Sequence, residues 1–169
     1  MGGWLSSYWG YAGDDVLDAA TGLTGKQKRL VTETWGIMQK DSRRVARAIF
    51  MEFFNQHPEY QKQFAALKNI PYQDLPENKR FQAHGASVIS AINEIVSSLY
   101  DPGLLEATLV ALGEKHFKRG QTKEQFLHLK VVLMSVFREF VGSRWTTEVN
   151  DAWNTTLDAA FGLIFKAYA

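Results

Sequence analysis

From Thr24 onward, apolar residues recur at three- and four-residue steps through almost the whole chain. This spacing places them on one face of an α-helix, whereas a half-buried strand needs apolar residues at every second position. No segment with strand-type alternation competes with the helical pattern, and no internal repeat is visible in the sequence. The chain is therefore expected to be all-α.

Local signals divide this pattern into helices. Thr24 is a good N-cap for a first helix, and Pro58 should end a second helix because the residue before a proline avoids the helical conformation. Pro102 separates two further helices, and Gly120 suits the end of the later one. The helices with clear bounds are expected near 26–40, 42–56, 123–142 and 146–168.

The bulk composition limits the class of protein. The 169 residues fit one domain with a substantial core, and the net charge of +1 gives no basic surface for nucleic acid. The absence of cysteine excludes disulfides, thiolate metal sites and covalent attachment of haem. No apolar run approaches the roughly 18 residues that span a bilayer, and no secretory signal is apparent. A cytoplasmic protein is expected.

Residues 1–23 differ from the rest of the chain. They contain no Lys or Arg, and they combine three aspartates with several glycines and aromatic residues. We therefore expect an N-terminal extension over 1–23 and one helical domain over 24–169.

Two histidines, His84 and His116, each lie in an amphipathic helical segment. Val88 and Ile92 follow His84 at four-residue steps, and Leu112 precedes His116 by one such step. Each imidazole thus sits on or beside an apolar stripe, where an uncharged and oriented histidine suits a flat apolar cofactor. The alternative is that each is a partly exposed residue at the edge of the core.

Five features in a fixed order resemble the globin family over nearly all of residues 23–169. They are Trp35, the pattern FxxFFxxHPExxxxF at 50–64, HGxxV at 84–88, LxxxHxxxG at 112–120, and Trp153. The resemblance, to globins of invertebrate type, implies a globin fold with about seven to eight helices around a pocket for haem b. It also implies binding of dioxygen, NO and CO at the haem iron.

The resemblance assigns roles to individual residues. His116 matches the proximal histidine that ligates the iron, and His84 matches the distal histidine, which hydrogen-bonds dioxygen or ligates the iron itself. Phe64 matches the phenylalanine that stacks on the porphyrin. Phe50 and Val88 match residues that border the gas ligand. The further residues expected to line the haem slot are Phe81, Ile92, Leu112 and Phe126, and Lys115 and Arg119 either meet the haem propionates or are solvated charges.

Five other positions complete the comparison with this family. Gly85 and Ala46 match the small residues where two globin helices cross closely. Gln121 departs from the pattern, because an apolar residue often faces the haem edge there; its side chain either tilts outward or touches a propionate. His57 is expected to face solvent, and His128 is expected at the core edge or on the surface.

The first residues, Met-Gly-Gly-Trp-Leu-Ser, fit the pattern for N-myristoylation at Gly2. One myristoyl chain binds bilayers with an association constant on the order of 10⁴ M⁻¹, so a second contact is needed. The aromatic residues Trp4, Tyr8, Trp9 and Tyr11 are of types that settle at headgroup depth. Weak, reversible attachment to the plasma membrane is the prediction, and the alternative is an unmodified extension that packs on the domain.

Three functions follow from the resemblance. The first is reversible binding of dioxygen for transport or storage. The second is redox chemistry with two histidines on the iron: NO dioxygenation, nitrite reduction or protection of membrane lipid from peroxides, each with an external electron donor. A membrane-proximal tail favours the second. The third, a scaffold without haem, is disfavoured because His84, His116 and Phe64 are all present.

Overall fold

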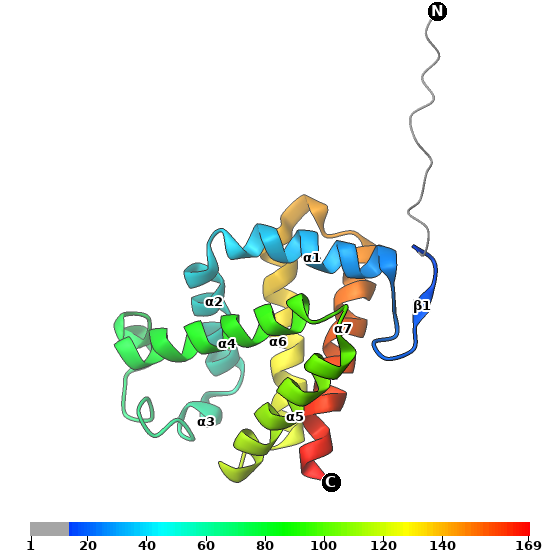
Figure 1. Cartoon of the computed structure of the whole chain (residues 1–169). Helices are drawn as coiled ribbons and strands as arrows, with labels where there is room; N and C mark the ends of the chain where they lie inside the picture. Colours follow the sequence, from blue (N-terminus) through cyan, green and yellow to red (C-terminus); the bar gives the residue numbers. More distant parts are fainter. Residues whose placement is uncertain (1–13) are drawn as a thin grey trace, which may run out of the picture.

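A computed structural model of the protein describes residues 14–169, and these residues are almost entirely helical (Figure 1). The all-α expectation is confirmed. In chain order the elements are β1 (Leu17–Asp18), β2 (Leu23–Thr24), α1 (Gly25–Gln39), α2 (Ser42–Gln56), α3 (Pro58–Gln61), the 3₁₀ turn η1 (Tyr72–Glu77), α4 (Lys79–Ser97), α5 (Pro102–Lys118), α6 (Lys123–Val141), η2 (Gly142–Arg144), α7 (Thr147–Phe165) and η3 (Lys166–Tyr168).

Side-chain caps set the starts of two long helices. The Thr24 hydroxyl accepts from the Gln27 backbone N–H, while the Gln27 side chain accepts from the Thr24 backbone N–H at 2.9 Å. Thr122 and Gln125 form the same reciprocal pair at the start of α6. Each pair satisfies two of the backbone donors that a helix N-terminus leaves free. Gly120 follows the end of α5 with φ +81°, the left-handed conformation that glycine adopts without strain.

The core lies where α1, α2, α4, α5, α6 and α7 pack against one another (Figure 1). Trp35, Phe137 and Trp153 form its aromatic centre, with ring centroids 4.6 to 6.3 Å apart. Helices α2 and α4 cross closely, because a Cβ built on Gly85 would lie 3.1 Å from the Cβ of Ala46. The small residues expected at this crossing are therefore found there.

A short antiparallel pairing of β1 with β2 precedes α1, and the sequence pattern gave no sign of it. Leu23 of β2 is fully buried, and Lys28 donates to Asp18 at 2.5 Å. These contacts fix residues 17–24 on the helical body. Within the described part of the chain, no helix is long and apolar enough to span a membrane.

Candidate functional site

His116 lies in the last turn of α5 with its imidazole oriented by a hydrogen bond. Its Nδ1 is 2.9 Å from the backbone oxygen of Leu112. Because a carbonyl oxygen only accepts, Nδ1 must carry the proton and donate, which leaves the lone pair on Nε2. Phe126 of α6 packs against the ring at 5.3 Å between centroids. A half-buried imidazole held in this tautomer is prepared to ligate a metal through Nε2.

His84 lies on α4 with its ring against two phenylalanines. The ring centroids are 4.7 Å from Phe50 and 4.9 Å from Phe64. Burial, together with the smaller electrostatic effects of the nearby His116 and Arg119, lowers the pKa of His84 from 6.5 to about 4. The side chain is therefore an uncharged imidazole at neutral pH. Because His116 and Arg119 act on it electrostatically, the ends of α4 and α5 that carry these groups face a common space.

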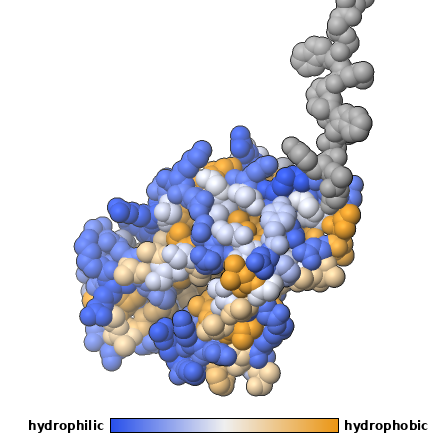
Figure 2. Space-filling model, in the orientation of Figure 1, coloured by the Kyte–Doolittle hydropathy of each residue, from blue (hydrophilic) through white to orange (hydrophobic). Residues whose placement is uncertain are grey.

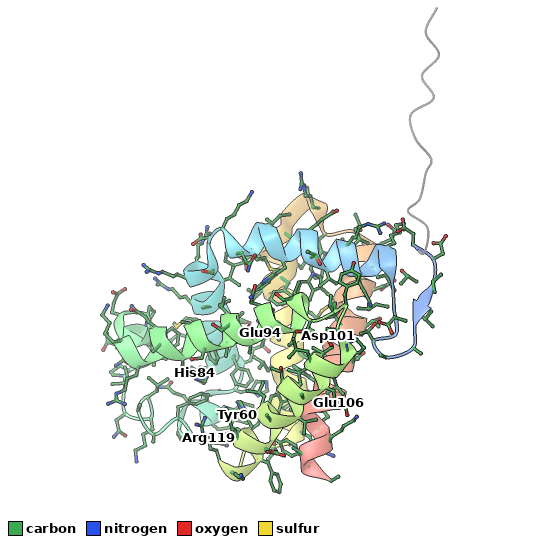
Figure 3. The ribbon with its side chains drawn as sticks, viewed as in Figure 1. Tyr60, His84, Glu94, Asp101, Glu106 and Arg119 are labelled. Atoms are coloured by element: carbon green, nitrogen blue, oxygen red, sulfur yellow. The ribbon has the colours of Figure 1, made fainter. Side chains whose placement is uncertain are left out.

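Apolar side chains surround this space. Phe50 forms ring contacts with Phe54, Phe64, Phe81 and His84, with centroids 4.7 to 6.4 Å apart. The surface is recessed in the region where Figure 3 labels His84, between the α3 side of the molecule and α5 (Figure 2). Of the other residues expected to line the haem slot, Phe81, Ile92 and Phe126 are buried and Phe64, Val88 and Leu112 are half-buried.

The two basic residues that flank His116 differ in their relation to the site. Lys115 is exposed. Arg119 is also exposed, yet its charge contributes to the lowered pKa of His84. Figure 3 shows Arg119 at the end of α5 that faces the region of His84. Arg119 is therefore the better placed of the two to meet an anionic group at this site.

Gln121 carries the clearest sign of a missing polar partner. Its Oε1 is buried and has no hydrogen-bond partner, so the side chain does not tilt outward into solvent. The Gln121 backbone N–H donates to the His116 carbonyl at 3.1 Å, which places this amide beside the candidate metal ligand. Turning the amide over would present Nε2 as a buried donor. A haem propionate is the kind of acceptor that this position needs, so Gln121 fits the haem that the resemblance implies.

A second hollow in the surface shares only Phe81 with the residues expected to line the haem slot. A groove of about 1020 Å³ lies between the start of α2, η1 and the start of α4. It is lined by charged residues such as Arg43, Arg47 and Lys79, and it contains neither His84 nor His116. The described residues also hold no group of three or more His, Asp or Glu side chains that could bind a metal ion.

The expectation that His57 faces solvent is wrong. Its side chain is 21% exposed, and its ring stacks on that of His128 with centroids 4.2 Å apart and planes 9° from parallel. Nδ1 of His128 also shares a hydrogen bond with the Tyr60 hydroxyl at 2.8 Å. The sequence carried no signal for this cluster, because Tyr60 and His128 are 68 residues apart.

Comparisons with known proteins agree with this arrangement. Residues 47–164 match the family model described as Globin. The chain is 31% identical over 142 residues to an anaerobic nitrite reductase of Casuarina glauca, covering 81% of this chain and 87% of that protein. It is 30% identical over 153 residues to an anaerobic nitrite reductase of Gossypium hirsutum, covering 86% of this chain and 92% of that protein.

Solved structures of haem proteins are similar to this chain in fold. The structure reported for cyanide binding to the hexa-coordinate hemoglobin of Drosophila melanogaster superposes with a TM-score of 0.79 at 26% identity, covering 85% of this chain and 94% of that one. A hexacoordinated heme protein from an anhydrobiotic tardigrade reaches a TM-score of 0.83 at 15% identity, covering 89% and 98%. The second likeness concerns the fold alone.

Proposed function

The chain belongs to the globin family, and we propose that it reversibly binds dioxygen and other diatomic gases at haem iron, with His116 as proximal ligand and His84 on the distal side. Haem iron is the cofactor of this fold. When bound, the haem supplies an iron centre that takes up diatomic gases and changes oxidation state.

The observation that carries this proposal is the uncharged state of His84, which is half-buried among phenylalanines. His116 and Arg119 lie close enough to lower its pKa electrostatically. A neutral imidazole has one N–H donor and one lone pair. It is therefore able to hydrogen-bond a bound gas molecule, which a protonated imidazole in an apolar space would do only at a high desolvation cost.

Other residues of the chain complete the site. His116, with Nδ1–H bonded to Leu112, would hold the metal through Nε2. Phe64 and Phe126 would pack against the macrocycle, and Val88 and Phe50 would restrict the space above it. Gln121 and Arg119 would meet the propionates. The apolar walls would exclude water from the distal side and so slow oxidation of the iron.

A redox function is the second candidate, and the same His84 supports it. An uncharged imidazole is able to ligate iron itself as well as to donate to a gas. Two plant relatives are named as anaerobic nitrite reductases, and a structural relative is named as a hexa-coordinate hemoglobin. Nitrite reduction, NO dioxygenation or reduction of lipid peroxides would each need an external electron donor.

We also propose that Gly2 is N-myristoylated and tethers the protein weakly to the plasma membrane from the cytoplasmic side. The support is the sequence pattern alone, since Gly2 and Ser6 lie outside the described residues. The division into an extension over 1–23 and a globin domain over 24–169 stays a prediction.

The absorption spectrum of the haem-loaded protein, ferric and dithionite-reduced, separates the two functions. Reversible gas binding predicts a reduced spectrum with an open sixth site and a stable dioxygen complex. Ligation by His84 predicts the sharp, split bands of low-spin reduced haem. In either case His84→Leu should change the result, by faster oxidation of the dioxygen complex or by loss of the low-spin bands.

His116→Ala is the control, because it should prevent stable haem uptake. An unchanged spectrum and an unchanged oxidation rate in His84→Leu would show that His84 does not act in the haem pocket. Stoichiometric haem with an unchanged spectrum in His116→Ala would overturn the whole assignment.

A further inference from the structure

A second cluster of titratable side chains lies outside the haem site, where α3 meets α6. The hydroxyl of Tyr60 is 2.8 Å from Nδ1 of His128, and His57 stacks on both rings, at 4.9 Å from Tyr60 and 4.2 Å from His128. Tyr60 is half-buried, and Figure 3 labels it below His84 in the same region of the molecule. A phenol is thus paired with a base inside an aromatic stack.

The surroundings keep this phenol protonated as long as the ring is not oxidised. Burial raises the pKa of Tyr60, and the carboxylates of Glu124 and Glu59 raise it further. The carboxylate of Glu59 also lies 3.5 Å from Nδ1 of His57. Nδ1 of His128, 2.8 Å from the Tyr60 hydroxyl, is the atom that can take up the proton when the phenol is oxidised.

Aromatic rings connect Tyr60 to the haem site without a break. The ring of Tyr60 is 5.3 Å from Phe53, Phe53 is 5.9 Å from Phe54, and Phe54 is 5.2 Å from Phe64. Phe64 in turn packs against His84 at 4.9 Å. This series of ring contacts links the phenol to Phe64 and His84 of the haem site.

We propose that Tyr60 is a redox-active residue. After a hydroperoxide has oxidised the haem, Tyr60 passes electrons to the haem from an external donor. Tyr60 gives up one electron, its O–H bond breaks, and the proton moves to Nδ1 of His128, which leaves a neutral phenoxyl radical. A one-electron donor of the ascorbate class then reduces the radical, and His128 returns the proton. Two such cycles supply the two electrons that reduce a hydroperoxide to an alcohol and water, with two protons from solvent.

The other described tyrosines lack this arrangement. Tyr72 donates to the backbone oxygen of Met51 at 2.8 Å, and a carbonyl cannot take up the proton. Tyr168 has a buried hydroxyl without a partner. Tyr100 is 64% exposed, and the Nζ of Lys28 lies 4.8 Å from its ring centroid, a positive charge that opposes loss of an electron. Tyr60 is therefore the described tyrosine from which a proton and an electron can leave together.

The test is electron paramagnetic resonance of the haem-loaded ferric protein, mixed with hydrogen peroxide and frozen at successive times. The wild-type protein should give a tyrosyl radical signal that ascorbate removes. Tyr60→Phe keeps the ring and its packing but has no O–H bond, so most of that signal should be lost. His128→Phe keeps the stack on His57 but removes the proton acceptor, and it should also lose the signal. Tyr72→Phe is the matched control and should retain it.

The inference rests on haem binding by the proposed site, so each variant is also checked by its carbon monoxide difference spectrum. A wild-type protein that lacks the carbon monoxide difference spectrum would contradict the proposed function itself. A normal carbon monoxide spectrum with no radical in the wild type, or with an undiminished signal in Tyr60→Phe, would overturn the relay alone. Equal loss of signal in Tyr72→Phe and Tyr60→Phe would overturn it as well.

Discussion

At the scale of single residues, the uncharged state of His84 has a consequence for the stability of the haem-free chain. Folding lowers the pKa of His84 from about 6.5 to about 4. Between these values the unfolded chain binds a proton that the folded chain does not, so the free energy of unfolding falls as pH falls. The stability from this group is complete above about pH 6.5 and is lost progressively as pH drops towards 4.

The expected loss between pH 7 and pH 5 is about 1–2 kcal/mol, reduced from the full linkage value because the ring is only partly buried. Urea unfolding of the haem-free protein at several pH values measures it. In His84→Leu the part of the pH dependence due to this residue should vanish. If the variant and the wild type lose stability equally between pH 7 and 5, the imidazole is not buried as described.

At the scale of helices, the approach of α5 to α7 positions His116. A Cβ built on Gly113 would lie 2.2 Å from the backbone oxygen of Ile164, so no larger residue fits unless one helix moves. Gly113→Ala is expected to destabilise the protein by about 1–3 kcal/mol. Because His116 lies less than one turn further along α5, the displaced helix should also release haem faster. Thermal unfolding and transfer of haem to an acceptor protein measure the two effects.

Gly162→Ala on the neighbouring helix is the matched control. A Cβ there meets nothing within 4 Å, and the position is inside α7. Alanine should stabilise the protein by about 0.5–1 kcal/mol through its higher helix propensity. A Gly113→Ala protein as stable as Gly162→Ala would contradict the close contact.

Helix bounds were predictable from sequence wherever a local signal sets them. Thr24 and Thr122 cap helices that begin at the next residue, and the second helix ends before Pro58 as expected. These signals act within a few residues, so a sequence alone carries them. The pairing of β1 with β2 was missed because two-residue strands are too short to show alternation.

The candidate site was predictable for a different reason. The spacing of histidines and phenylalanines along three helices matches a known family. The motif therefore indicates contacts between residues that lie far apart in the sequence. The stacking of His57 on His128 belongs to no such motif, and only the packing of α3 against α6 reveals it. The buried oxygen of Gln121 likewise became evident only from its surroundings.

At the scale of the whole molecule, ion pairs hold the first described residues on the helical body. Lys28 holds Asp18, and Arg29 pairs with Asp14, so the chain is anchored on α1 up to the first described residue. Val16 and Leu17 beside this anchor are 68% and 63% exposed. Val16 and Leu17 are therefore the described apolar side chains that lie nearest in sequence to an acyl chain on Gly2.

The membrane prediction is tested with protein co-expressed with an N-myristoyltransferase and mixed with phosphatidylcholine vesicles. The acylated protein should sediment with the vesicles weakly, with an association constant on the order of 10⁴ M⁻¹ or somewhat above it if the aromatic residues add contacts. Gly2→Ala cannot be acylated and should stay in the supernatant. An unacylated wild-type sample separates the lipid from the aromatic residues: its binding should match that of Gly2→Ala. Equal sedimentation of the acylated protein and Gly2→Ala would show that the lipid anchors nothing, because only the first of them carries it.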